Sequence, residues 1–177
     1  MLNRRLILEA SMNYSETCAY QRSFRQFARI DHWLNPHAIT LTLRQGLAVS
    51  NGAADTFVLL TRELAVQNYR HFLNLLSSMT LGQAAKRFGK RVNSISTIEG
   101  GRGKRLHIHA VIDCPRDDLL ERFPSMITEA WRMTQWGHGQ IDIQRDANAG
   151  WINYISKLRD KPDYGEAIDW VNYHNAD

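Results

Sequence analysis

The chain has 177 residues, with only two cysteines, four prolines and no long apolar run. Cys18 and Cys114 do not have the spacing of a metal site, and we expect both to be free thiols. The apolar stretch at residues 6–8 is too short for a signal-peptide core, and no segment approaches the roughly 20 apolar residues of a membrane span. These absences predict a cytoplasmic protein without a membrane partner.

Basic residues are in slight excess, with 22 Lys and Arg against 18 Asp and Glu. This balance permits nucleic-acid binding without requiring it. The positive charge gathers around residues 86–105, in "GKRV" and "GGRGKR". Such a cluster is either a nucleic-acid contact or a solvated loop rim. The length suits one domain, which we place at residues 36–177, after an N-terminal helical extension over residues 1–35.

Hydrophobic periodicity predicts alternating helices and strands after this extension. The alternating run "AITLTL" predicts a strand over 38–43, followed by a loop to residue 54. The extension itself contains a helix over 14–33. The remaining predicted elements are helices over 55–77, 80–88, 116–135 and 150–158, and strands over 92–99, 105–113 and 140–145.

The order of these elements predicts the fold class. Strand, helix, two strands joined by a turn, helix and strand suggest an α+β fold with an antiparallel, ferredoxin-like sheet. We expect helices on one face of the sheet and an open second face. The polar and aromatic tail after residue 158 either packs back on the domain or lies loose.

The stretch "KRLHIHAVID" (104–113) carries two histidines in an apolar strand. Side chains alternate along a strand, so His107 and His109 share a face about 7 Å apart, while Leu106 and Ile108 face the helices. Two imidazoles at this spacing can chelate one metal ion. The alternative is a surface-facing histidine pair on a half-exposed strand.

A carboxylate near the histidines would complete a metal site. In the simplest register the turn over 100–104 places Glu99 opposite Arg105, which makes Glu99 the diagonal neighbour of His107. Two histidines and one carboxylate suit a divalent ion such as Mn²⁺ or Mg²⁺. A register shift of one residue would remove Glu99 from the site, and Asp113 would then be the replacement.

The stretch "NYISK" provides a second candidate for chemistry. Residues three apart lie on one face of a helix, so Tyr154 and Lys157 are neighbours. A phenol beside an ammonium group is a plausible nucleophile, because the cation favours the phenolate. The alternative is a surface tyrosine that stacks on a lysine side chain.

The motifs "ITLTL", "HIHAVID" and "YISK", in this order, resemble the three motifs of HUH endonucleases. The likeness spans roughly residues 38–160 and is closest to single-tyrosine initiators of rolling-circle replication. The resemblance implies that His107, His109 and Glu99 are metal ligands and that Tyr154 is the nucleophile. It also implies that Lys157 is the supporting base of Tyr154 or a phosphate contact. Thr40 and Thr42 lie in the first motif, whose role in the family is less defined.

The resemblance also implies a substrate and partners. Single-stranded DNA at an origin or hairpin would lie on the open sheet face. A helicase of the host would act in trans, because "GGRGKR" lacks the pattern of a P-loop. Four basic residues are expected to contact the DNA phosphates: Arg44, Arg102, Lys104 and Arg105.

Other functions remain open at this point. Relaxases and insertion-sequence transposases share the motifs of the superfamily. From different classes, the chain could be a non-enzymatic nucleic-acid-binding module on a ferredoxin-like sheet, or a metal-dependent hydrolase in which Tyr154 is unimportant. The leading helix over 14–33 lies outside the resemblance, and either contacts a partner or DNA or packs against the edge of the sheet.

Overall fold

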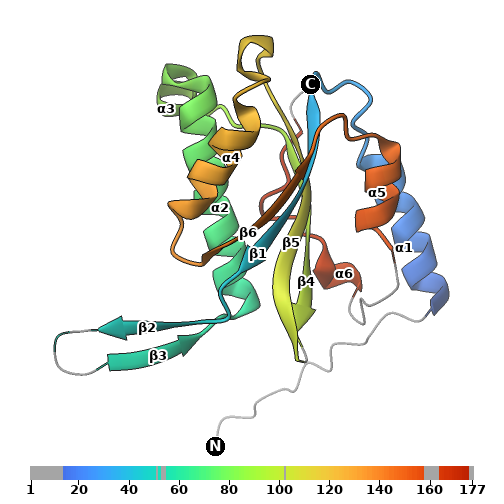
Figure 1. Ribbon diagram of the computed structural model, residues 1–177. Helices are drawn as coiled ribbons and strands as arrows, with labels where there is room; N and C mark the ends of the chain where they lie inside the picture. The colour runs from blue at the N-terminus through green and yellow to red at the C-terminus, as the bar shows by residue number, and fades with distance from the viewer. Residues whose placement is uncertain (1–13, 51, 53–54, 102, 158–163, 176–177) are drawn as a thin grey trace, which may run out of the picture.

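The computed structural model describes residues 14–50, 52, 55–101, 103–157 and 164–175 (Figure 1). Its centre is a four-stranded antiparallel sheet with the order β4-β5-β1-β6. The strands are β1 (Pro36–Leu43), β4 (Ser94–Gly101), β5 (Lys104–Asp113) and β6 (Gly137–Gln144). The α+β class and the antiparallel sheet are therefore confirmed.

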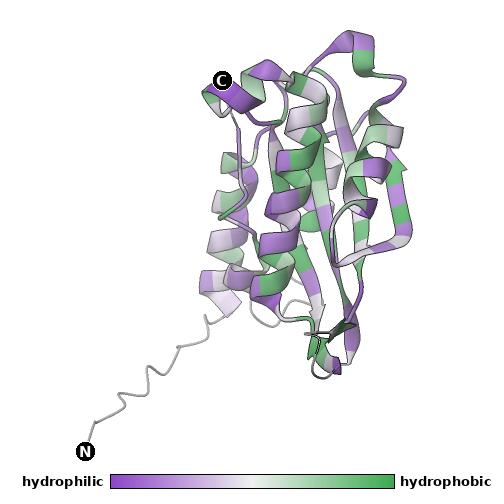
Figure 2. Cartoon of the chain, turned by 90° about the vertical axis from the view of Figure 1, so that its left-hand side faces the viewer, coloured by the Kyte–Doolittle hydropathy of each residue, from purple (hydrophilic) through white to green (hydrophobic). Residues whose placement is uncertain are grey.

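The first face of the sheet is covered by α2 (Arg62–Leu81) and α4 (Phe123–Arg132), and α3 (Gln83–Phe88) follows α2. Helix α2 begins at Thr61, whose side chain accepts a hydrogen bond from the Leu64 N–H at 3.3 Å. In Figure 2 the helices carry both hydrophilic and hydrophobic residues, and the strands beside them are rich in hydrophobic ones. The alternate β5 residues Ile108, Ala110 and Ile112 join this core, as predicted.

The second face is not open along its whole length, and this part of the prediction is wrong. Helices α1 (Tyr14–Phe27) and α5 (Ala149–Ile155) lie over it (Figure 1). The physical reason is that this face also carries apolar side chains, which need cover from water. These side chains form a second buried cluster with residues of the two helices: Ala38, Ile95, Val111, Phe24, Ile152 and Ile155.

A two-stranded hairpin was missed by the sequence prediction. Residues 46–59, expected to be a loop and a helix start, form β2 (Gly46–Ser50) and β3 (Asp55–Leu59). The run "DTFVLL" has β-branched and aromatic residues that favour a strand. Leu47 and Val58 pack against the first core.

The C-terminal segment packs back against the sheet. Single antiparallel bridges join Thr97 to Ile168 and Ser94 to His174, beside the short helix α6 (Tyr164–Ala167). The segment therefore shields the exposed edge of β4, which would otherwise offer unpaired backbone groups. Helix α5 ends at Ile155, before its predicted end, and residue 158 lies outside the described part of the chain.

Candidate metal centre and neighbouring tyrosine

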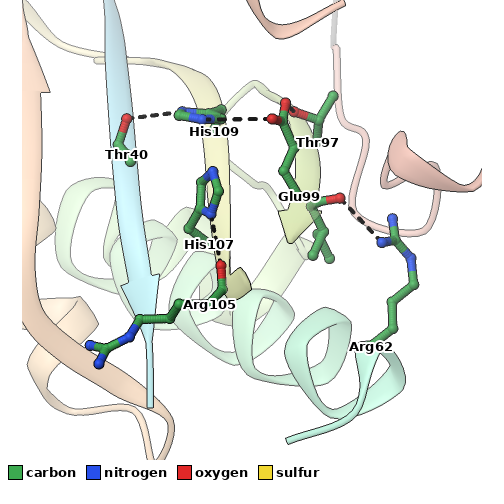
Figure 3. A network of polar contacts seen from close by, with 8 residues as sticks. Thr40, Arg62, Thr97, Glu99, Arg105, His107 and His109 are labelled. Atoms are coloured by element: carbon green, nitrogen blue, oxygen red, sulfur yellow. Dashed lines mark hydrogen bonds and ion pairs between the residues drawn. The ribbon is translucent and has the colours of Figure 1, made fainter. Parts of the chain in front are cut away.

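Three of the predicted ligands come together on the second face of the sheet. Glu99 lies on β4, and His107 and His109 lie two residues apart on the adjacent strand β5 (Figure 3). One ligand atom of each lies within 4.8 Å of those of the other two. The His109 Nε2 and Glu99 Oε2 atoms are 4.0 Å apart. The group can therefore hold a metal ion.

The register between β4 and β5 differs from the prediction. Glu99 pairs directly with His107 instead of Arg105, and Gly101 pairs with Lys104. The shift arises from an irregularity at Gly100, whose φ is +112° and where a Cβ atom would lie 2.5 Å from the Arg105 carbonyl oxygen. Glycine at this position thus brings the carboxylate directly opposite the first histidine.

Hydrogen bonds from the ligands' own strands and from β1 orient the ligands. His107 Nδ1 lies 3.0 Å from the Arg105 carbonyl oxygen, which can only accept, so Nδ1 carries the proton and the Nε2 lone pair is left for a metal (Figure 3). His109 Nδ1 lies 3.0 Å from Thr40 Oγ1. The Thr97 hydroxyl donates to Glu99 Oε1 at 3.3 Å. Contacts of this kind fix ring orientation at metal sites.

The residues present fit a divalent ion. Bonds of about 2.1 Å place neighbouring ligands about 3 Å apart and opposite ligands about 4.2 Å apart, so modest side-chain rotation would close the group on an ion. The two imidazole donors suit transition-metal ions better than Mg²⁺, which prefers oxygen ligands. Three protein ligands also leave coordination positions for water or a substrate oxygen.

Tyr154 lies beside this group. Its ring centroid is 5.5 Å from that of His109, at an interplanar angle of 85°. The side chain is 42% exposed, so a substrate can reach it. The Lys157 ammonium lies 4.3 Å from the centre of the same ring, so the two side chains are neighbours as predicted, although Lys157 lies beyond the end of α5 at Ile155.

Helix α5, which carries Tyr154, is held from two sides. Ile152 and Ile155 are buried in the second cluster. From α1, Gln21 donates to the Ser156 carbonyl at 2.5 Å, and Arg25 donates to the Ser156 hydroxyl at 2.7 Å. Arg25 also donates to the carbonyl of Asn153 at 3.3 Å. The sequence analysis did not identify these contacts, because they join residues more than 120 positions apart.

The remaining predicted residues lie at the margin of the site or away from it. Arg44, Lys104 and Arg105 are exposed, and Figure 3 shows the Arg105 guanidinium directed away from the imidazoles. Arg102 lies outside the described residues.

Asp113, considered as a replacement carboxylate, is not part of the group. It is buried and accepts hydrogen bonds from the backbone N–H groups of Leu34 at 3.3 Å and Asn35 at 2.7 Å. Burial raises the pKa of this carboxyl group. Asp113 therefore fixes the segment that leads into β1.

Comparison of the chain with profiles of known protein families, with curated proteins and with solved structures gave no match. The resemblance to HUH endonucleases therefore rests on the quoted motifs. Within the described residues, none of the helices has both the length and the apolar character needed to cross a membrane.

Proposed function

We propose that this protein nicks and rejoins single-stranded DNA through a covalent bond between Tyr154 and the 5′-phosphate, with a divalent metal ion. The observation that carries the proposal is the position of Tyr154 against His109, at the edge of the group formed by Glu99, His107 and His109. An exposed tyrosine beside three metal-ligating side chains fits a nucleophile better than a structural residue. The biological role we propose is initiation of rolling-circle replication of a plasmid, phage or virus-like element.

The order of elements supports the same proposal. Leaving out the β2–β3 hairpin, the chain runs β1, α2, β4, β5, α4 and β6, and the sheet order is β4-β5-β1-β6. This order agrees with the β-α-β-β-α-β arrangement of ferredoxin-like folds, the fold expected from the resemblance to HUH endonucleases, and so supports the proposal. Fold alone does not define an activity, so the site carries the argument.

In the proposed reaction the Tyr154 oxygen attacks the scissile phosphorus. A bond forms between this oxygen and phosphorus, the bond from phosphorus to the 3′ oxygen breaks, and the electron pair leaves with that oxygen. The phenol proton passes to solvent, and the departing 3′ oxygen gains a proton from water. Lys157, whose ammonium lies 4.3 Å from the centre of the Tyr154 ring, contributes positive charge beside the phosphate. When bound, a divalent ion supplies positive charge beside the phosphate, a contribution of several kcal/mol.

The tyrosyl ester conserves the phosphodiester bond energy. Attack by a free 3′-hydroxyl reverses the step and rejoins the strand, so one site can both cut and join. A relaxase or transposase would use the same chemistry on different DNA. An origin hairpin as the preferred substrate would favour replication, and paired terminal palindromes would favour transposition.

The test is covalent capture of DNA. A single-stranded library with a randomised central segment, labelled at its 3′ end, is incubated with the protein and Mn²⁺ and then separated on a denaturing gel. We expect a labelled adduct, because the protein keeps the 5′-phosphate of the downstream fragment. The same library labelled at its 5′ end should yield a shorter free product whose 3′-hydroxyl a polymerase can extend.

Two variants make the test specific. Tyr154→Phe should abolish the adduct and the cleavage, while Tyr14→Phe, at a tyrosine 80% exposed on α1, should leave both unchanged. Cleavage that survives in Tyr154→Phe would indicate a metal-dependent hydrolase without a covalent step. Binding without cleavage by the wild-type protein would favour the non-enzymatic module.

A further inference from the structure

Residues 64–98 contain no aspartate or glutamate. The same stretch holds five basic residues, four of them clustered at α3 and the loop that follows it. All four are exposed, and so is Phe88 between them, at 77%. We call these four the α3 basic surface: Lys86, Arg87, Lys90 and Arg91.

The charges of this surface are not compensated by carboxylates. In the described part of the chain none of the four forms an ion pair. By contrast, three other exposed arginines each lie within 3.0 Å of a carboxylate: Arg29 with Asp31, Arg116 with Asp118, and Arg145 with Glu121. The α3 basic surface therefore presents uncompensated positive charge to solvent. The charges of the other three arginines are partly cancelled by their carboxylate partners.

A hollow of about 270 Å³ lies within the surface. Lys86, Lys90 and Arg91 line it together with polar residues of α2, among them Asn74 and Ser78. The lining has no carboxylate and no aromatic ring. Such a hollow offers several hydrogen-bond donors to a phosphate group and no surface on which an unpaired base could stack.

The surface lies apart from the candidate metal centre. Helix α3 follows α2, which covers the first face of the sheet (Figure 1). The metal ligands lie on the second face, because His107 and His109 alternate with the first-face residue Ile108 and share a face with Val111 of the second buried cluster. A short single strand bound at Tyr154 would not reach it. The two regions can serve different parts of one DNA molecule.

We propose that the α3 basic surface binds the phosphate backbone of duplex DNA. The choice of DNA as the partner rests on the proposed function, but the binding requires neither the metal nor Tyr154. Uncompensated lysines and arginines neutralise phosphates and release counterions, which gives affinity without sequence preference. Duplex DNA is favoured over a single strand because Phe88, the exposed ring of this surface, does not line the hollow and so offers no base-stacking partner there.

The experiment measures binding of a fluorescent duplex by anisotropy, with EDTA present and in a Tyr154→Phe background, so that no cleavage interferes. The test variant carries Lys86→Gln, Arg87→Gln and Lys90→Gln. The matched control carries Arg29→Gln, Arg116→Gln and Arg145→Gln, which changes the net charge equally. We expect affinity to fall at least tenfold in the test variant and less than twofold in the control.

Salt dependence gives a second readout. Loss of three phosphate contacts should reduce the slope of log affinity against log salt by about 2.7, since each contact contributes about 0.9. The double variant Lys86→Arg, Lys90→Arg keeps the charge and should bind as the parent does. Its normal binding would show that the loss in the test variant comes from charge removal instead of misfolding.

Several outcomes would overturn the inference. Equal losses in test and control variants would show that only net charge matters. Unchanged binding in the test variant, or tighter binding to phosphatidylserine vesicles than to duplex DNA, would also contradict it. The result is separable from the proposed function, because the test variant with Tyr154 restored should still form the adduct on short single strands. If the wild-type protein formed no adduct, the proposed nicking activity would be wrong, but the measured duplex binding would still be valid.

Discussion

At the scale of single residues, the contacts around His109 matter as much as the imidazole itself. Thr40 reaches its Nδ1 from β1, the neighbouring strand, at 3.0 Å. The hydroxyl holds the ring so that Nε2 faces Glu99. Removal of such a partner at a metal site typically costs a factor of 10 to 100 in affinity.

We therefore predict that Thr40→Val lowers Mn²⁺ affinity by about 10-fold to 100-fold, measured by isothermal titration calorimetry. His109→Ala should abolish measurable binding. The control Thr56→Val changes an exposed threonine on β3 and should have no effect. Unaltered affinity in Thr40→Val would mean that the hydroxyl does not orient the ring.

A third histidine is buried away from the metal centre. His37 is 1% exposed, its Nδ1 donates to the Asn35 carbonyl at 2.8 Å, and its Nε2 has no hydrogen-bond partner within the described residues. Burial lowers its pKa, and the charge of Arg145 acts in the same direction. Protonation of His37 therefore opposes folding.

The consequence is a pH-dependent stability. The folded protein binds fewer protons than the unfolded chain once the pH falls below about 6.5, so stability is complete above that value and decreases as the pH falls through the folded pKa. We expect the urea midpoint, measured with EDTA present, to fall in this window. His174, whose pKa burial also lowers, contributes in the same direction.

His37→Asn should be less stable than the wild type at neutral pH, with a shallower loss of stability below about pH 6.5. Asparagine keeps a donor for the Asn35 carbonyl but cannot be protonated. If the difference in urea midpoint between the two proteins stayed constant across this pH range, His37 would not be a source of the pH dependence.

At the scale of elements, α1 acts as a support for α5. Arg25 and Gln21 hold the end of the short helix that carries Tyr154. Their hydrogen bonds go to Asn153 and Ser156 and not to the metal ligands, so we regard them as positioning residues. Helix α1, which precedes the predicted domain, therefore affects the site by holding α5 in place.

For Arg25→Ala we predict that the rate of adduct formation falls about tenfold, equivalent to about 1.4 kcal/mol, with little change in KM for the oligonucleotide. Arg25→Lys should recover part of the rate by donating to the same region. Arg22→Ala, at an exposed position on the same helix, is the control. A rise in KM with an unchanged rate would place Arg25 in DNA binding instead.

The strand irregularity at Gly100 is a second feature of the elements on which the site depends. It sets the register that brings Glu99 opposite His107. An alanine there must adopt a φ of +112° and would place Cβ 2.5 Å from the Arg105 oxygen. Gly103 also has a positive φ, +87°, but nothing lies within 4 Å of a Cβ atom at that position.

We predict that Gly100→Ala costs about 1–3 kcal/mol or more of unfolding free energy and also weakens Mn²⁺ binding, because the strand must move to relieve the clash. Gly103→Ala should lose stability from backbone strain while keeping its metal affinity. Equal metal affinities in the two variants would show that the register does not depend on Gly100.

At the scale of the whole molecule, metal binding and folding are linked. The ligands come from the edge strand β4 and the inner strand β5, and the two buried clusters pack against opposite faces of their sheet. An ion that binds the folded state alone stabilises it by mass action.

With Mn²⁺ at about 100 times its dissociation constant, the stabilisation should be about 2.7 kcal/mol. For a chain of this length each kcal/mol raises Tm by about 2–4 °C, so we expect a rise of about 5–11 °C by scanning calorimetry. Glu99→Gln should remove the rise, and Glu129→Gln, at an exposed position on α4, should keep it. A similar rise in both variants would place the ion elsewhere.

The sequence by itself determined the local geometry of the site. Alternation along "KRLHIHAVID" separates His107 and His109 from the core residues Ile108 and Ala110. The short separation of Tyr154 and Lys157 in the chain keeps them close, although α5 ends at Ile155. The relation on the strand holds because residues two apart on a strand share a face whatever the rest of the chain does. The α+β class followed from the same periodicities.

The tertiary structure decided the contacts between distant segments. The register of Glu99 depends on the irregularity at Gly100, which a glycine-rich turn accommodates in more than one way. The covering of the second face depends on where α1 and α5 dock, and the hydrogen bond from Thr40 to His109 depends on which strand neighbours β5. Such contacts depend on packing between elements far apart in the chain, and local patterns do not encode that packing.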